Sequence, residues 1–288
     1  MSINRRSFVK NTALAAAAGW VIPSSARVPE KVSDNMGARS FGIQLWTVKE
    51  DMTANAKDTL AKLAGYGYQQ IESFEGGKGM FWGWNHLEFK KYMDDLGMSI
   101  VSSHCNYLLD FERKAAEAAE IGMKYLICPW KGPQKSIDGF KKAAAEFNKA
   151  GEICKKNGIR FAYHNHDYSF KIIDGLVPQE VMMNETDSSL VDFEMDIYWV
   201  VAAGEDPMQW FKKFPGRFKL CHVKDLKKTA KGQESVQIGR GVIDYPAILS
   251  RGIQSGLSYL IIEQEAFTGT SQMESANANA GYMRGLRV

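Results

Sequence analysis

The stretch Phe161-Ala162-Tyr163-His164-Asn165-His166 decides how this chain is interpreted, because a short apolar run ends in two histidines placed two positions apart. A β-strand sends residues i and i+2 to the same face, so both imidazoles are predicted to point into one cavity. Three later apolar runs end in the same way, with the pairs Glu194/Asp196, His222/Lys224 and Glu263/Glu265. Imidazoles and carboxylates are ligands for divalent metal ions. The four runs therefore predict a barrel and a metal site together.

Outward from this stretch, the chain alternates short apolar segments with amphipathic ones. The predicted strands cover 40–47, 68–73, 99–104, 124–129, 159–164, 191–196, 218–222 and 257–263. The predicted helices cover 54–64, 86–96, 110–121, 136–157, 179–185, 207–214 and 245–255, with a long loop before the last of these and a further helix from about 271. Eight βα units in about 250 residues predict a single closed (β/α)₈ TIM barrel. A doubly wound open sheet is the alternative, but no phosphate-binding glycine loop follows the first predicted strand.

The N-terminus reads as an export signal rather than as part of the barrel. Asn4-Arg5-Arg6-Ser7 is a twin-arginine pattern, and an apolar stretch and the small-residue site Ser24-Ser25-Ala26 follow it. This order predicts a twin-arginine signal peptide over 1–26, a polar linker over 27–38 and one barrel domain over 39–288. The apolar stretch is too short for a comfortable membrane span. We therefore expect a periplasmic or otherwise exported protein with no membrane span in its mature chain. A fortuitous basic amphipathic start is the alternative.

Charge and cysteine content narrow the function classes. The chain has 36 basic and 33 acidic side chains, and removal of Arg5, Arg6 and Lys10 with the signal peptide leaves equal numbers. A neutral domain lacks the electrostatic footprint of a nucleic-acid-binding protein. The four cysteines form no spaced metal motif, so we expect buried thiols rather than a disulfide framework.

In a TIM barrel the carboxyl ends of the strands form the mouth of the active site. The residues predicted at these ends are polar or aromatic, although apolar residues precede them. They are Gln44 and Trp46, Glu72, His104, Trp130, His164 and His166, Asp196, His222 and Lys224, and Glu263 and Glu265. Burying so many polar groups without partners is costly, so the pattern indicates a functional site.

Taken together, these motifs make the chain resemble the sugar phosphate isomerase/epimerase superfamily, which has a xylose isomerase-like TIM barrel. The resemblance is strongest to an exported bacterial branch of keto-sugar metabolism, and it covers about residues 40–288. It depends on His164-Asn165-His166, Glu194-Met195-Asp196-Ile197-Tyr198-Trp199, Ala203-Gly204-Glu205-Asp206-Pro207, His222-Val223-Lys224-Asp225, Gly239-Arg240-Gly241-Val242-Ile243-Asp244 and Glu263-Gln264-Glu265.

The resemblance implies one divalent metal ion held by His164, Asp196, His222 and Glu263. His164 stands where the wider superfamily has a glutamate, which puts a proton shuttle between two glutamates in doubt. Two imidazoles favour Mn²⁺, Co²⁺, Zn²⁺ or Fe²⁺ over Mg²⁺. The alternative is that both histidines are core or loop residues without a metal.

Catalytic roles are predicted for Glu263, Lys224, His104 and Glu72, with Lys224 stabilising an enediolate and the pair His104/Glu72 acting as acid or base. Substrate contacts are predicted for Trp46, Trp130, His166, Glu265 and Arg240. The tryptophans suit the face of a sugar ring, and Arg240 lies in a loop that looks like a phosphate loop. A solvated lysine and simple packing of the tryptophans are the alternatives.

The predicted activity is a metal-dependent isomerase or epimerase that acts on a keto-sugar or keto-glycoside through an enediolate. A 3-keto-glycoside lyase or dehydratase with the same metal site is the runner-up. An AP-endonuclease-like metallohydrolase and a non-catalytic sugar-binding barrel are further alternatives, and the neutral charge argues against the endonuclease. We expect a small sugar as the partner and no nucleic acid. A homo-oligomer stays open, because the sequence does not give the oligomeric state.

Overall fold

The structure is a computed structural model that describes residues 40–230 and 232–288. The predicted signal peptide and linker lie outside these residues. In the ranges that are described, no helix combines the length and the apolar character that crossing a membrane requires.

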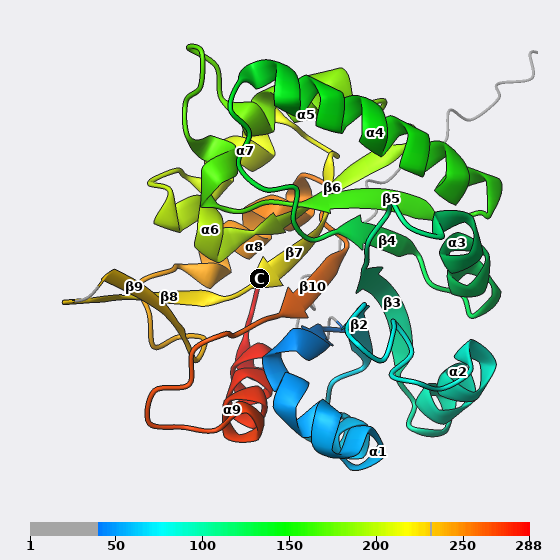
Figure 1. The fold of residues 1–288 in the computed structure, drawn as a ribbon. Coiled ribbons are helices and arrows are strands. Elements are labelled where there is room, and N and C mark those ends of the chain that lie inside the picture. Colours follow the sequence, from blue (N-terminus) through cyan, green and yellow to red (C-terminus); the bar gives the residue numbers. More distant parts are fainter. Residues whose placement is uncertain (1–39, 231) are drawn as a thin grey trace, which may run out of the picture. The chain divides into compact units, whose positions relative to one another are not determined.

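Within these ranges the strands and helices alternate along the chain (Figure 1). The strands are β1 (Gly42–Gln44), β2 (Gln70–Phe74), β3 (Ser99–His104), β4 (Tyr125–Cys128), β5 (Arg160–His164), β6 (Val191–Asp196), β7 (Phe218–Val223), β8 (Asp225–Thr229), β9 (Gly232–Val236) and β10 (Tyr259–Ile262). The helices are α1 (Lys49–Tyr66), α2 (His86–Asp95), α3 (Phe111–Glu120), α4 (Ile137–Lys156), α5 (Pro178–Glu185), α6 (Ile197–Ala202), α7 (Pro207–Lys213), α8 (Tyr245–Gln254) and α9 (Gln272–Gly285), with 3₁₀ turns η1 (Leu45–Val48) and η2 (Asp167–Phe170).

Eight of the strands are parallel and close into a barrel in the order β1-β10-β7-β6-β5-β4-β3-β2. This confirms the predicted (β/α)₈ TIM barrel. All the carboxyl ends of parallel strands meet at one rim, so β5, β6, β7 and β10 bring their last residues side by side there. The predicted site therefore has a common location.

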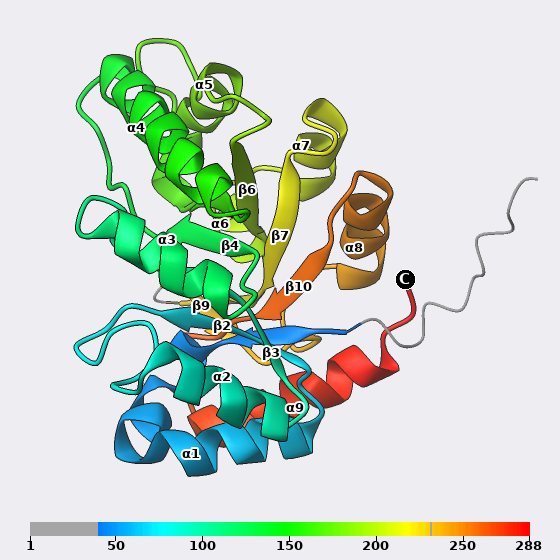
Figure 2. The same cartoon turned by 90° about the vertical axis from the view of Figure 1, so that its right-hand side faces the viewer.

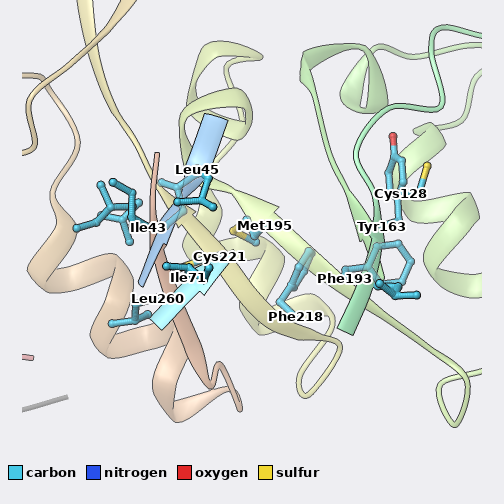
Figure 3. Packing of buried hydrophobic residues seen from close by; sticks show 14 of the residues in the cluster. Ile43, Leu45, Ile71, Cys128, Tyr163, Phe193, Met195, Phe218, Cys221 and Leu260 are labelled. Carbon is cyan, nitrogen blue, oxygen red and sulfur yellow. The ribbon is translucent and has the colours of Figure 1, made fainter. Parts of the chain in front are cut away.

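The core consists of apolar strand residues that are buried on both faces of the sheet, as parallel barrels require. Ile43, Ile71, Phe193, Met195 and Cys221 are completely or almost completely shielded from solvent (Figure 3). The four cysteines are buried and free, which confirms the prediction of buried thiols without disulfides.

Local sequence explains how the covering helices begin and end. In α4, the buried residues Ile137, Phe140, Ala144 and Phe147 recur at spacings of three and four, which places one apolar stripe on the barrel. Helix α9 begins with a capping box between Ser271 and the residue three positions later. It lies beside α1 (Figures 1 and 2).

Three local features differ from the predictions. The first strand ends at Gln44, because the backbone turns into η1. The helix α6 follows β6 directly and was not predicted. The predicted long loop contains the antiparallel hairpin β8–β9, which extends from the barrel (Figure 1).

Candidate metal centre

Four side chains converge at the carboxyl ends of four neighbouring strands, and we call them the metal quartet: His164, Asp196, His222 and Glu263. One ligand atom of each lies within 4.8 Å of the others. The Nδ1 of His222 is 3.1 Å from Glu263 Oε2 and 3.2 Å from His164 Nε2. Asp196 Oδ2 is 3.4 Å from His164 Nε2. Tetrahedral ligands about 2.1 Å from an ion lie about 3.4 Å from one another, so this spacing fits a divalent ion.

Asp196 is fixed from two directions. Its Oδ1 caps α6 by accepting a hydrogen bond from the backbone N–H of Trp199 at 3.0 Å. The side chain of Asn165 joins the two strands by bonding both the backbone N–H and the carbonyl of Asp196 at 3.1 Å. The other carboxylate oxygen of Asp196, Oδ2, is buried and accepts no hydrogen bond from the described residues. The Lys224 ammonium lies 3.5 Å from this oxygen, and the oxygen keeps lone pairs that a metal ion could use.

His222 uses its two ring nitrogens for different partners. Its Nδ1 faces the metal quartet, and its Nε2 donates to Glu72 Oε1 at 2.7 Å. A carboxylate in this position fixes the tautomer and the ring orientation of a metal-binding histidine. Burial lowers the pKa of His222, but Glu194 and Glu263 outweigh it and raise the pKa above its ordinary value. His222 must therefore lose its Nδ1 proton before it can bind a metal.

A second group lies beneath the metal quartet, and we call it the Glu72 cluster: Glu72, His104 and Glu194. The Nε2 of His104 is 2.9 Å from Glu194 Oε2 and 3.1 Å from Glu72 Oε1. Burial would raise the pKa of Glu72, but His104 and His222 lower it well below its ordinary value. Burial, together with the charge of Glu72, raises the pKa of Glu194 to about 7. Burial lowers the pKa of His104, but the two carboxylates raise it to about 9.

The strand pairing has a register shift directly before each of the two glutamates of this cluster. The register of β2 against β3 shifts between Ile71 and Glu72, and the register of β6 against β7 shifts between Phe193 and Glu194. Such bulges turn a side chain away from simple alternation, and they are common next to active sites. Glu72 is also held by Ser102, whose hydroxyl donates to Oε2 at 2.6 Å.

Lys224 is completely buried against three carboxylates. Its Nζ lies 2.5 Å from Glu265 Oε2, 3.2 Å from Glu263 Oε2 and 3.5 Å from Asp196 Oδ2. Burial lowers the pKa of Lys224, but the neighbouring carboxylates outweigh it and raise the pKa above its ordinary value. Lys224 is therefore an ammonium ion that can stabilise negative charge, and it is unsuited to act as a base.

A cavity of about 710 Å³ opens above the metal quartet. Its walls include the predicted residues Trp46, His104, Trp130, His164, His166, Glu263 and Glu265. Glu72 is fully buried below and does not line the cavity. Glu72 contacts His222 and His104 there, and its predicted acid or base role stays a prediction.

Arg240 lies elsewhere than predicted. It lines a separate cavity of about 170 Å³ beside the β8–β9 hairpin. The loop that looked like a phosphate loop is turned inward, because the carboxylate of Asp225 accepts the backbone N–H groups of Gly239 at 2.8 Å and Gly241 at 2.9 Å. These amides are used inside the protein, so the loop offers no phosphate cradle.

Sequence reasoning gave no role to several residues that line or support the site. Glu194 was a candidate for orienting a ligand, contacting substrate or transferring a proton, but its contact with His104 was not predicted, because that contact requires the closed barrel. Tyr107, Leu108 and Leu109 line the cavity from the loop after β3. The available signal was the pair of leucines in an otherwise polar loop.

Fold and site together define a (β/α)₈ barrel whose buried imidazoles and carboxylates can hold a metal ion at the catalytic rim. Residues 60–287 match the model of the xylose isomerase-like TIM barrel family. The chain belongs to this family.

Solved structures of similar chains agree with this assignment. A sugar phosphate isomerase/epimerase from Parabacteroides distasonis is 27% identical, with a TM-score of 0.75 over 91% of this chain and 98% of that one. Two further structures show the fold alone. IOLI protein with a zinc atom is 14% identical, with a TM-score of 0.68 over 84% of this chain and 96% of that one. A xylose isomerase-like TIM barrel protein from Mycobacterium smegmatis with magnesium is 13% identical, with a TM-score of 0.66 over 85% of this chain and 95% of that one.

Among curated proteins, the inosose dehydratase of Clostridium perfringens is 32% identical over 89 residues. The matched segment is 31% of this chain and 29% of that relative. The family therefore includes similar chains named for isomerase, epimerase and dehydratase reactions.

Proposed function

We propose that this chain is a metal-dependent sugar isomerase or epimerase that acts on a keto-sugar or keto-glycoside through an enediolate. The observation that carries the proposal is the convergence of the metal quartet at one rim of the barrel, where His164 and Glu263 line a cavity of about 710 Å³. The similarity to the isomerase/epimerase of Parabacteroides distasonis supports the same reaction class.

The metal quartet suits one divalent ion, and its two imidazoles favour Mn²⁺, Co²⁺, Zn²⁺ or Fe²⁺ over Mg²⁺. Zinc and magnesium in structures of the same fold support a divalent ion without selecting one. When bound, such an ion supplies Lewis-acid polarisation of a carbonyl group and of its neighbouring hydroxyl.

The chain's own residues provide acid, base and electrostatic groups around that position. His166 is a neutral imidazole at neutral pH, because burial and the nearby His164 lower its pKa to about 2. An imidazole with so low a pKa is too weak a base to remove a proton from carbon, so His166 is a proposed hydroxyl contact. Glu265, whose pKa is raised by burial and by Glu263, lines the same cavity and is the proposed base. The Lys224 ammonium is fully buried behind Glu263 and Glu265, which line the cavity, so its proposed role is electrostatic stabilisation, from behind these carboxylates, of negative charge that develops in the cavity. His104, on the β3 side of the cavity, is protonated and is the proposed proton donor. Lys224 holds Glu265 at the edge of the cavity.

Elimination from the same intermediate is the second candidate, which would make the protein a lyase or dehydratase. Two observations favour it. His164 stands where a carboxylate would allow a two-glutamate proton shuttle, and the partial match to inosose dehydratase links the chain to a dehydratase. A base and a separate acid in one cavity suit removal of a proton and protonation of a leaving group.

The test is incubation of the metal-loaded chain in heavy water with a panel of keto-sugars and 3-keto-glycosides, followed by NMR of the products. Isomerisation or epimerisation is expected, with deuterium at the carbon next to the carbonyl. Loss of water or of the aglycone instead selects the lyase. Metal analysis accompanies the assay. His222→Ala and Glu263→Ala are expected to abolish turnover while the circular dichroism spectrum is retained. Unlabelled product, or tight binding without any turnover, refutes the enediolate enzyme.

We also propose export through the twin-arginine route, which is supported by Arg5 and Arg6 and the apolar stretch after them. Arg5→Lys/Arg6→Lys is expected to leave uncleaved precursor in the cytoplasm, measured by fractionation and N-terminal sequencing. Processing of this variant at the wild-type rate would contradict the proposal.

A further inference from the structure

The cavity has two chemically different parts. Its inner part carries the imidazoles and carboxylates of the metal site, on the ends of β5 and β10. Its outer part is formed by the loops after β3 and β4, including Tyr107, Leu108, Leu109 and Trp130. A volume of about 710 Å³ falls in the range of pockets for drug-sized ligands, which exceed a single sugar ring.

The outer part exposes unusually large apolar side chains. Leu108 is 69% exposed, Leu109 63% and Trp130 56%. Nine large hydrophobic side chains are exposed in the described part of the chain, and Leu108, Leu109, Trp130 and Trp46 are the four that line this cavity. Apolar surface gathered at one mouth, beside a polar floor, indicates a binding surface rather than random scatter.

The charged side chains of the outer part are paired within the protein. Glu75 accepts from buried Lys114 at 2.7 Å. Lys131 donates to Glu146 at 2.5 Å. Asn106 Oδ1 accepts the backbone N–H of Leu108 at 2.9 Å. A second sugar ring would need free donors and acceptors here, whereas an apolar group needs none.

Trp130 marks the boundary between the two parts. Its ring meets His166 edge to face, with centroids 4.5 Å apart, and contacts Tyr168 at 4.8 Å. A group that extends from the metal quartet past His166 would therefore meet Trp130, and Leu108 and Leu109 line the same cavity.

We propose that the outer part binds an aromatic aglycone, so that the preferred ligand is an aryl glycoside whose sugar ring lies at the metal quartet. This inference rests on the proposed function for the sugar half of the ligand. The aglycone half depends on the exposed apolar side chains of the β3 and β4 loops and on the internal pairing of their polar neighbours.

The test is calorimetric titration of the zinc-loaded full chain with matched phenyl and methyl β-glycosides of glucose, galactose and xylose, and with cellobiose. For at least one sugar, the phenyl glycoside is expected to bind about tenfold or more tightly than the methyl glycoside, because its ring leaves water. Leu108→Ser/Leu109→Ser should reduce this ratio to about one third or less. These side chains are exposed, so the fold should persist. Leu87→Ser/Val242→Ser, at exposed apolar positions outside the cavity, is the matched control and should keep the ratio.

The proposal is overturned if the affinity for the phenyl glycoside is less than twice that for the methyl glycoside with all three sugars, or if no phenyl glycoside binds. It is also overturned if cellobiose binds more tightly than the phenyl glycosides, or if Leu108→Ser/Leu109→Ser leaves the phenyl-to-methyl affinity ratio unchanged. These affinities are measured on glycosides without a keto group, so they are independent of turnover. Failure of the keto-glycoside assay with a preserved phenyl preference would refute the proposed enzyme and leave the aglycone site standing.

Discussion

Replacement of Glu72 by glutamine is expected to weaken divalent metal binding about tenfold, although Glu72 lies outside the metal quartet. Its carboxylate accepts the Nε2 proton of His222 at 2.7 Å, which leaves the Nδ1 lone pair for the metal. Loss of such a partner typically costs about 10–100-fold in metal affinity, or about 1.4–2.7 kcal/mol.

The lower end of this range is expected because other groups near His222 Nε2 limit the loss of metal affinity. Glu194 Oε2 lies 3.4 Å from the same Nε2 and can accept its proton in part. A glutamine at position 72 also retains one acceptor oxygen, and Ser102 and Gln44 still hold that side chain in place. Removing both acceptors with Glu72→Gln/Glu194→Gln should therefore approach the hundredfold end. The two effects should not add simply, because both groups serve one imidazole.

The assay is competition for Zn²⁺ or Co²⁺ against a chromophoric chelator at fixed pH, with circular dichroism to verify the fold. Asp192→Asn is the matched control, because Asp192 is a buried carboxylate of β6 that pairs with Arg160 and Tyr125 and has no contact with the metal quartet among the described residues. It should lower stability and leave metal affinity unchanged. A Glu72→Gln affinity within twofold of the wild-type value would refute the orienting role of Glu72.

Three further predictions follow from the same contacts. Lys224→Met should bind metal several-fold more tightly, because it removes an ammonium 3.2 Å from Glu263. The same variant should lower turnover about a hundredfold or more. Weaker metal binding by Lys224→Met in a titration would contradict the first expectation. The metal-free chain should lose unfolding free energy between pH 6.5 and 9, because the pKa of His104 is about 9 in the folded chain and 6.5 ordinarily. The stabilisation by protonated His104 is complete below pH 6.5 and fades as the pH rises through 9. Urea titrations of His104→Asn should show a smaller loss over this range, and a loss equal to that of the wild type would count against the prediction. Gly241→Ala should cost about 1–3 kcal/mol in urea unfolding, because a Cβ there collides with the carboxylate of Asp225, while Gly65→Ala, in open space, should cost nothing; equal stabilities would reject this packing.

The metal quartet could be anticipated because strand geometry is local. Residues at i and i+2 share a face, and the carboxyl ends of parallel strands share a rim, so the spacing indicated that the paired strand-end side chains meet at one site. The choice of His164, Asp196, His222 and Glu263 as ligands came from the family resemblance. The alternation of apolar segments also predicted the barrel, since burial on both faces leaves a strongly apolar signature.

Hairpin β8–β9 was not predicted, because its strands lack the apolar pattern that marked the barrel strands. Its strands are short and polar, with exposed residues such as Lys227 and Lys228, so periodicity gave no signal. The inward turn of the loop around Asp225 depends on a carboxylate distant in sequence from Gly241. Arg240 was therefore placed at the substrate from its motif, while the folded loop directs it to a separate cavity.

By itself, the sequence determined the barrel, the rim at which its polar strand ends meet and the kinds of side chain there, because these follow from periodicity and from the chemistry of side chains at strand ends. Only the tertiary structure decided that Glu72 and Glu194 lie against His222, because β2, β6 and β7 come together only when the barrel closes. It also decided that the cavity continues toward Leu108, Leu109 and Trp130. These features depend on contacts between residues far apart in the chain, whose energies no local pattern encodes.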